Sequence, residues 1–406
     1  MKSPGILALA LLAALRSSGQ PLQYSIQNDQ VIVKVMSPSG FFSLSSKATG
    51  KVFFRDATFE SPSGSVRTLP VDDKIFGRGE SLEISQADGR VHSLSLFPGL
   101  PFVLCRSVLH NGGTEPSLTR SVKMISGTVE LGLPAERLRT FGTGGLLEPG
   151  KNPGSYAWLA IADPASRQGM VVGWLTEDSG SGVVFSPVKD NQVKVEARLD
   201  FGRLRIPAGK SRPLETLAIG YFDDARLGLE AWADAVAKSY AIHLPPQPAG
   251  YCTWYSKPYG GAADEQHLAE LAAFAKTNLA PFGFSVVQID DHWQPGVSTN
   301  GPKRNFTTHN PSGPYPGGMK ATAANIHSLG LTPGLWFMPF AGTWYDPFFK
   351  EHADWFVKHE DGTPYETAWG GTCLDMTHPG ARQHLKALTQ RIAHEWGFTY
   401  FKLDGL

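Results

Sequence analysis

Residues 379–404 read PGARQHLKALTQRIAHEWGFTYFKLD and predict one helix followed at once by one strand. Pro379 suits the first turn of a helix, and Gly397 suits the position just past its end. One face of the helix is apolar, with Leu385, Leu388 and Ile392 at helical spacing. The strand predicted at 398–403 follows. This helix–strand unit indicates the fold class, because similar units precede it in the sequence.

The same unit recurs through residues 250–406. Further strands are predicted at 251–255, 284–289 and 335–340, and further helices after Asp264 and at 320–329 and 347–357. This alternation favours a parallel sheet of the (β/α)8 TIM-barrel type. A complete barrel needs about 250 residues, so we expect only about the first four units, in a sequence truncated at its C-terminus. The open sheet edge of a half-barrel predicts a poorly soluble chain.

A different pattern precedes these units. From residue 20 to 222, short segments alternate apolar and polar residues between Gly, Pro, Asn and Ser clusters, which predicts an antiparallel β-sandwich or barrel. A helix is predicted over 224–240, and Leu244-Pro245-Pro246-Gln247-Pro248 then forms a stiff spacer. The expected organisation is a β domain at 20–222, a linker at 223–249 and an α/β domain at 250–406.

The N-terminus has the pattern of an export signal. Lys2 is followed by an apolar run at 6–15 and by small residues, with cleavage expected after Gly19. We therefore expect a signal peptide at 1–19 and a secreted or periplasmic protein. No later stretch is long enough for a membrane helix, so we expect no membrane anchor.

Composition excludes several classes of partner and cofactor. The 37 Lys+Arg balance 37 Asp+Glu, so no basic surface for nucleic acid is expected. Three cysteines exclude a disulfide scaffold and offer no metal-binding spacing. From the cysteines we therefore expect no metal site.

Charged residues gather where predicted strands end, the place of chemistry in parallel barrels. Lys402 and Asp404 share one face of their strand, so Lys402 is expected to keep Asp404 ionised, as a nucleophile requires. A structural salt bridge is the alternative. Asp290 and Asp291 follow another strand, and their acceptor oxygens suit the hydroxyls of a polyol. A metal held with His292, or a capping loop without a ligand, remains open.

Two tryptophans complete this set. Trp254 lies in the first predicted strand and Trp336 in the third. An indole packs on the apolar face of a sugar while its N–H binds a hydroxyl, although a strand tryptophan is more often plain core. Together with the carboxylates, they favour a carbohydrate site.

These motifs, taken in order, resemble the clan D alpha-galactosidases, most closely glycoside hydrolase family thirty-six. The matching blocks are Gly250–Tyr255, Val287–Asp291, Tyr315–Lys320, Gly334–Trp336, Leu374–Asp375 and Tyr400–Asp404. The resemblance implies an N-terminal β-supersandwich before the barrel. It also implies a retaining exo-alpha-galactosidase without a cofactor, whose partner is an alpha-galactoside.

By the same resemblance, Asp404 is the nucleophile. Lys402, Asp290 and Asp291 bind galactose hydroxyls, and Trp254 and Trp336 form walls of the pocket. The acid/base Asp of the family lies on a later strand and is absent from this sequence, so we expect the 406-residue chain itself to be inactive. Assembly of the full-length protein into a homo-oligomer, and the natural galactoside, are left open.

Three other functions compete with this one. A galactosyl transferase resembling raffinose synthase shares the motifs, but an exported enzyme meets abundant water and dilute acceptors. An inert carbohydrate-binding homologue is a second alternative, against which the paired Lys402 and Asp404 argue. A metal-dependent hydrolase using Asp290, Asp291 and His292 is the third.

Overall fold

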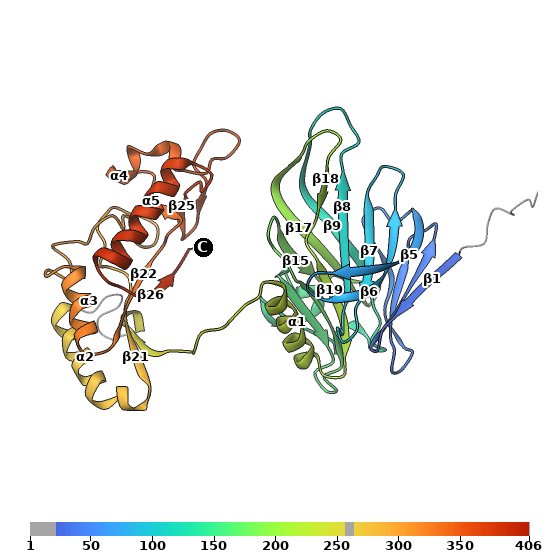
Figure 1. Cartoon of the computed structure of the whole chain (residues 1–406), viewed down its shortest axis with the longest axis horizontal. Helices are drawn as coiled ribbons and strands as arrows, with labels where there is room; N and C mark the ends of the chain where they lie inside the picture. Colours follow the sequence, from blue (N-terminus) through green and yellow to red (C-terminus); the bar gives the residue numbers. More distant parts are fainter. Residues whose placement is uncertain (1–21, 256–263, 406) are drawn as a thin grey trace, which may run out of the picture. The chain divides into compact units, whose positions relative to one another are not determined.

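The computed structural model describes residues 22–255 and 264–405, which divide into two compact units with the boundary between Leu244 and Pro245 (Figure 1). The boundary falls inside the segment 223–249 that the sequence assigns to a linker. The predicted signal peptide at 1–19 lies outside the described residues. Within the described part of the chain, no helix is long and apolar enough to cross a membrane.

The first unit is built from two large antiparallel sheets. One sheet has the order β1-β2-β3-β4-β9-β17-β15-β12, with β16 paired to β17; the other has the order β11-β10-β13-β14-β19-β8-β7-β6-β5, with β18 paired to β8. The strands of the first sheet are β1 (Leu22–Gln27), β2 (Val31–Ser37), β3 (Phe42–Ser46), β4 (Val52–Thr58), β9 (Ser117–Val129), β12 (Ser155–Tyr156), β15 (Ser181–Phe185), β16 (Val188–Lys189) and β17 (Gln192–Ile206). Those of the second are β5 (Ser65–Asp73), β6 (Gly77–Ser85), β7 (Val91–Leu96), β8 (Val103–His110), β10 (Arg139–Gly142), β11 (Gly145–Leu147), β13 (Trp158–Ala162), β14 (Gly169–Trp174), β18 (Ser211–Pro213) and β19 (Leu217–Phe222).

Period-two burial explains these sheets. In β2, Val31, Val33 and Val35 are buried while Lys34 between them is exposed. Such strands bury one face, and the apolar faces of both sheets contribute to one continuous core. The predicted sandwich-like N-terminal region is thus confirmed.

Helix α1 (Ala225–Ser239) packs against the second sheet. Asp224 caps it by accepting a hydrogen bond from the backbone N–H of Arg226. Trp232 donates through Nε1 to the carbonyl oxygen of Trp174 at 3.3 Å, and Gly173 leaves the room for this indole, because a Cβ there would lie 2.3 Å from Trp232 Nε1. The helix is therefore part of the first unit.

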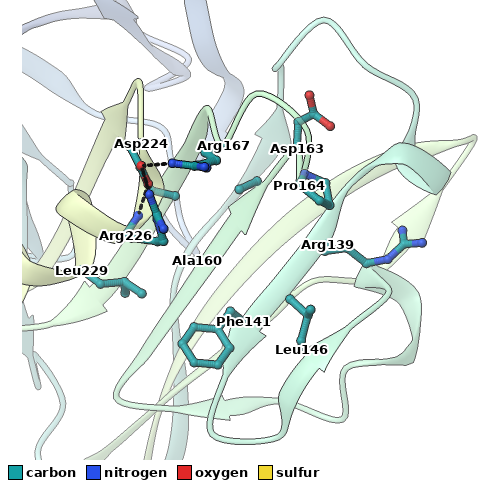
Figure 2. A pocket seen from close by; sticks show the side chains of 12 residues that line it. Arg139, Phe141, Leu146, Ala160, Asp163, Pro164, Arg167, Asp224, Arg226 and Leu229 are labelled. Atoms are coloured by element: carbon teal, nitrogen blue, oxygen red, sulfur yellow. Dashed lines mark hydrogen bonds and ion pairs between the residues drawn. The ribbon is translucent and has the colours of Figure 1, made fainter.

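A cavity of about 360 Å³ lies beside the start of α1 (Figure 2). Its wall is largely apolar, with Phe141 and Leu146 on one side. The charged groups at the other side satisfy one another, because Asp224 pairs with Arg226 at 2.6 Å and lies 3.6 Å from Arg167. These ion pairs fix the first turn of the helix to the β13–β14 loop.

The second unit centres on a four-stranded parallel sheet of order β20-β21-β22-β26. Its strands are β20 (Ala249–Cys252), β21 (Phe284–Ile289), β22 (Thr332–Phe337) and β26 (Tyr400–Leu403), and its longer helices are α2 (Glu265–Asn278), α3 (Met319–Ser328) and α5 (Pro379–Gln390). A small sheet of order β23-β25-β24 comprises β23 (Ala341–Gly342), β24 (Glu366–Thr367) and β25 (Gly371–Cys373). The strand β26 is one edge of the parallel sheet, and its Phe401 and Leu403 are exposed.

Three predicted elements in this unit differ most from the structure, and the strand predicted at 398–403 begins two residues later, at Tyr400. The strand predicted at 251–255 ends at Cys252, and Thr253–Tyr255 form a 3-10 turn. The third strand begins and ends three residues earlier than predicted, because a fully buried parallel strand is apolar throughout and gives no periodic signal. The helix predicted at 347–357 is only the short α4 (Pro347–Lys350) and a 3-10 turn at Ala353–Trp355.

Candidate active site

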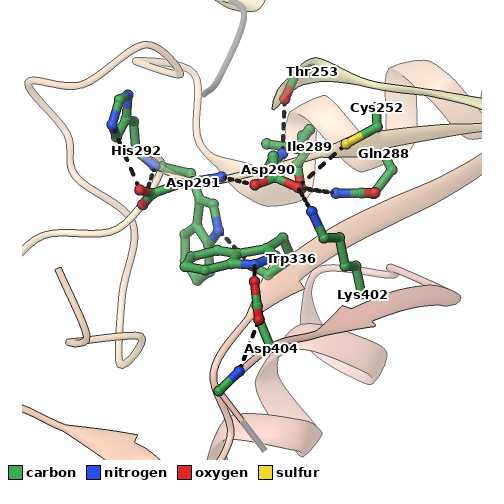
Figure 3. A network of polar contacts seen from close by, with 12 residues as sticks. Cys252, Thr253, Gln288, Ile289, Asp290, Asp291, His292, Trp336, Lys402 and Asp404 are labelled. Carbon is green, nitrogen blue, oxygen red and sulfur yellow. Dashed lines mark hydrogen bonds and ion pairs between the residues drawn. The ribbon is translucent and has the colours of Figure 1, made fainter. Parts of the chain in front are cut away.

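The candidate site lies where the parallel strands end at their carboxyl side (Figure 3). Asp290 and Asp291 directly follow β21, and Asp404 directly follows β26. Trp336 and Lys402 come from the last half of β22 and β26, and their backbones are partners in the sheet register. The parallel topology therefore brings together residues that are more than a hundred positions apart in the sequence.

Asp290 is the hub of the polar network. The residue is 2% exposed, and its Oδ2 accepts from Lys402 Nζ at 2.8 Å, Gln288 Nε2 at 2.9 Å and Cys252 Sγ at 3.3 Å. Its Oδ1 accepts from the backbone N–H of Asp291 at 3.0 Å. A buried carboxylate is tolerated only with such partners, so this network fixes Asp290 in one orientation.

Lys402 pairs with Asp290, and within the described residues no ion pair joins it to Asp404, so no direct contact supports the expectation that Lys402 keeps Asp404 ionised. Burial lowers the pKa of Lys402, but the hydrogen bond and charge of Asp290 outweigh this effect, so the pKa is raised overall. The Lys402 side chain therefore stays protonated and positively charged. Burial, with the adjacent Asp290 charge, also raises the pKa of the Cys252 thiol, which keeps this group protonated as a donor.

Asp404 is held by Trp336 and by its own backbone surroundings. Trp336 Nε1 donates to Asp404 Oδ2 at 3.0 Å, and the backbone N–H of Gly405 donates to Oδ1 at 2.9 Å. The Asp404 N–H donates in turn to the carbonyl oxygen of Phe337 at 3.1 Å. Trp336 is 2% exposed, so in this structure its indole N–H orients the carboxylate, and its role as a pocket wall stays a prediction.

Asp291 lines a cavity of about 470 Å³ beside the network. Its Oδ1 accepts from the backbone N–H of His292 at 2.7 Å and from Gln294 Nε2 at 2.6 Å. The cavity is lined by Trp254, Asp291, His292, Gln294, Ser298, Gly301, Pro302, Lys303 and Trp369. Of the residues predicted for the site, Trp254 and Asp291 line this cavity, while the other four lie in the adjoining network.

The backbone of His292 has φ +84°, a conformation that residues other than glycine rarely adopt. Its ring Nε2 lies 3.6 Å from Asp291 Oδ2. This geometry turns the chain sharply behind the Asp290–Asp291 pair. Among the described residues, no cluster of three or more His, Cys, Asp or Glu side chains is arranged to hold a metal ion.

Several lining residues were not identified from the sequence. Gln294 is buried and clamps Asp291 to the carbonyl oxygen of Lys303, and Trp369 lies half-exposed in the loop between β24 and β25. Neither residue belongs to a periodic element or a recognisable motif, so no signal in the sequence pointed to them. Asp375 serves a turn, accepting from the N–H of Thr377 at 2.8 Å.

Comparison with known proteins gives consistent results. The family model described as Melibiase matches residues 263–405. Alpha-galactosidase 2 of Pediococcus pentosaceus is 26% identical over 172 residues, which are 41% of this chain and 22% of that protein. The chain thus spans less than a quarter of this relative.

Solved structures resemble the chain over both units. The alpha-galactosidase from Lactobacillus brevis matches with a TM-score of 0.64 and 13% identity, over 95% of this chain and 63% of that chain. A variant of the GH36 alpha-galactosidase AgaA from Geobacillus stearothermophilus, in complex with raffinose, matches with a TM-score of 0.62 and 13% identity, over 94% of this chain and 65% of that chain. At these identities the likeness is one of fold.

Proposed function

We propose that this chain, with its Melibiase segment at 263–405, is part of a retaining exo-alpha-galactosidase that removes terminal alpha-D-galactosyl residues from oligosaccharides or galactosides. The observation that supports this most directly is the position of Asp404. Its carboxylate is held by Trp336 at the same strand ends that carry the Asp290–Lys402 pair. A carboxylate suited to nucleophilic attack thus lies at the same strand ends as groups suited to bind hydroxyls.

The two hydrogen bonds to Asp404 prepare it for attack. Trp336 and the Gly405 N–H each occupy one carboxylate oxygen, which fixes the group while each oxygen keeps a further lone pair. In a double displacement, one oxygen attacks the anomeric carbon and forms a glycosyl–enzyme ester. A second carboxylic acid, about 5 Å away across the bond, protonates the leaving oxygen, and water then releases galactose with retained configuration.

Lys402 is suited to bind the sugar while holding Asp290. An ammonium group has three N–H donors, and Asp290 Oδ2 takes one of them. The Lys402 side chain is 33% exposed, so its remaining donors are available to hydroxyls of galactose. Asp290 and Asp291 complete this polar wall, and Trp254 offers an indole at its rim.

The finer architecture belongs to the same proposal. We infer that the four parallel strands form about the first half of a (β/α)8 barrel in the whole protein. Support comes from β26, whose Phe401 and Leu403 side chains are exposed at the sheet edge, where a further strand and helix would cover them. Export to a secreted or periplasmic location, based on the pattern at 1–19, is likewise a proposal.

Covalent trapping tests the nucleophile. The chain is incubated with a mechanism-based galactoside inhibitor whose leaving group needs no protonation, and intact and peptide masses are measured. We expect one adduct, on Asp404, which the Asp404→Asn variant does not form. Asp375→Asn is the matched control, because that turn carboxylate lies outside the network and should leave labelling unchanged. An adduct that persists in Asp404→Asn, or a chain that is never labelled, would refute the assignment.

A further inference from the structure

Two indoles, not one, border the cavity beside Asp291. Trp254 and Trp369 are both 47% exposed, and both line the cavity. Trp254 was predicted from the sequence, whereas Trp369 lies in the tight loop that joins β24 to β25. A large apolar side chain left half-exposed beside polar groups is the kind of surface that receives the apolar face of a sugar ring.

Arg304 fixes the backbone of Trp369. This arginine is 1% exposed, and its Nη2 donates to the carbonyl oxygens of both Trp369 and Asn300. Its Nη1 donates to Ser298 Oγ at 3.0 Å and to Thr343 Oγ1 at 3.3 Å. No carboxylate in the described part of the chain forms an ion pair with it, and burial lowers its pKa. A buried cation held only by neutral acceptors is costly, so its position needs a reason.

The packing around Arg304 admits no side chains at two neighbouring positions. A Cβ on Gly371 would lie 2.4 Å from Arg304 Nε, and a Cβ on Gly301 would lie 2.8 Å from the carbonyl oxygen of Trp369. Asn300 Nδ2 also donates to the carbonyl oxygen of Thr367 at 3.3 Å. The loop at 298–304 and the β24–β25 loop are therefore joined into one rigid wall that presents Trp369 to the cavity.

We propose that Trp369 is a second sugar-binding indole, which together with Trp254 binds a pyranose ring of the galactoside, and that Arg304 is its positioning residue. The proposal rests on the proposed function, because it assumes that the cavity receives a galactoside. The buried Asp291 carboxylate supplies the polar floor, and the two indoles supply the apolar surface. Because Arg304 fixes Trp369 before the ligand arrives, little ordering of the wall is needed on binding.

Binding of raffinose and methyl alpha-galactoside to the chain tests the role of Trp369 by calorimetry. We expect Trp369→Ala to weaken binding about tenfold, as loss of one aromatic contact does, and Trp369→Phe to retain most of the affinity. Trp344→Ala is the matched control, because Trp344 is similarly exposed, at 44%, but does not line the cavity. It should bind both sugars as the unmodified chain does.

A double-variant cycle tests Arg304. Arg304→Lys keeps the charge, but a lysine cannot bridge both carbonyl oxygens. We therefore expect Arg304→Lys to weaken sugar binding when Trp369 is present, and to cause no further loss when Trp369→Ala is already present. A loss that simply adds to that of Trp369→Ala would show that Arg304 does not act through Trp369. Equal affinities of Trp369→Ala and Trp344→Ala would overturn the sugar-binding role while leaving the galactosidase proposal intact. A chain that binds neither sugar would overturn both.

Discussion

Lys402 Nζ lies 2.8 Å from Asp290 Oδ2 and joins the ends of two strands, β26 and β21, that are separated in the sheet by β22. The Asp290 side chain is 3% exposed and that of Lys402 is 33% exposed. The contact crosses the carboxyl end of β22, the strand that carries Trp336, and so links the polar groups on either side of that strand. This ion pair determines which charged side chains are already paired within the protein and which can contact a ligand.

Removing this cation should destabilise the second unit. Lys402→Met leaves Asp290 buried with only neutral donors, and we expect a loss of about 2 kcal/mol in the free energy of unfolding, less than for a fully buried pair because Lys402 is partly exposed. Urea unfolding measures the loss. Adding Asp290→Asn to Lys402→Met removes the unpaired charge and should restore part of the stability. A further drop in the free energy of unfolding would show that loss of the ion pair does not explain the effect of Lys402→Met.

The indole–carboxylate contact should matter for reactivity. Trp336→Phe removes the donor to Asp404 Oδ2 while keeping an aromatic ring, and a hydrogen bond to a charged group contributes about 1.5–3 kcal/mol. We therefore expect covalent labelling of Asp404 by the galactoside inhibitor to slow by about tenfold or more. The labelling rate under single-turnover conditions measures this. An unchanged rate would mean that the Gly405 N–H alone orients the carboxylate.

Stability of the first unit should fall in acid through His92. The His92 ring is buried and stacks on the Phe59 ring, with the two ring centroids 4.4 Å apart. Its Nδ1 forms a hydrogen bond with Ser107 Oγ at 2.7 Å. Burial, with a smaller contribution from the Arg90 charge, lowers the pKa of His92 to about 4. The unfolded chain therefore takes up a proton near pH 6.5, before the folded protein does.

The free energy of unfolding should consequently decline by roughly 3 kcal/mol between pH 6.5 and pH 4 on account of this group, and level off below. Urea titrations at several pH values, compared between the unmodified chain and His92→Gln, isolate the contribution. The same substitution at the exposed His243 is the control and should leave the pH profile unaltered. Identical slopes for the chain and His92→Gln would contradict the prediction.

The packing of α1 on the sandwich can be tested at Gly173. Gly173→Ala places a methyl group 2.3 Å from Trp232 Nε1, and such overpacking costs about 1–3 kcal/mol. Gly144→Ala is a matched control, because its Cβ would meet its nearest neighbour at 3.5 Å, an ordinary contact. Thermal melts of both variants provide the measurement. Similar melting temperatures would indicate that the helix moves away without cost.

Much of the architecture was readable from local sequence patterns. Period-two alternation such as that around Lys34 predicted the antiparallel strands, and the caps Asp224 and Asp264 marked the starts of α1 and α2 as the structure has them. These features depend on nearest neighbours along the chain, so the sequence contains them directly. The predicted bounds were less accurate for strands buried on both faces, such as β22, because a continuous run of apolar residues has no alternation that marks where the strand begins and ends.

Local sequence patterns also predicted which residues follow the strands, so Asp290, Asp291, Lys402 and Asp404 were expected in one region. How these side chains pair depends on the packing of the strands and loops. Lys402 contacts Asp290, Trp336 contacts Asp404, and Trp369 reaches the cavity through its link to Arg304. Such contacts join residues tens of positions apart, and their geometry depends on how strands and loops pack in three dimensions, which no local pattern records.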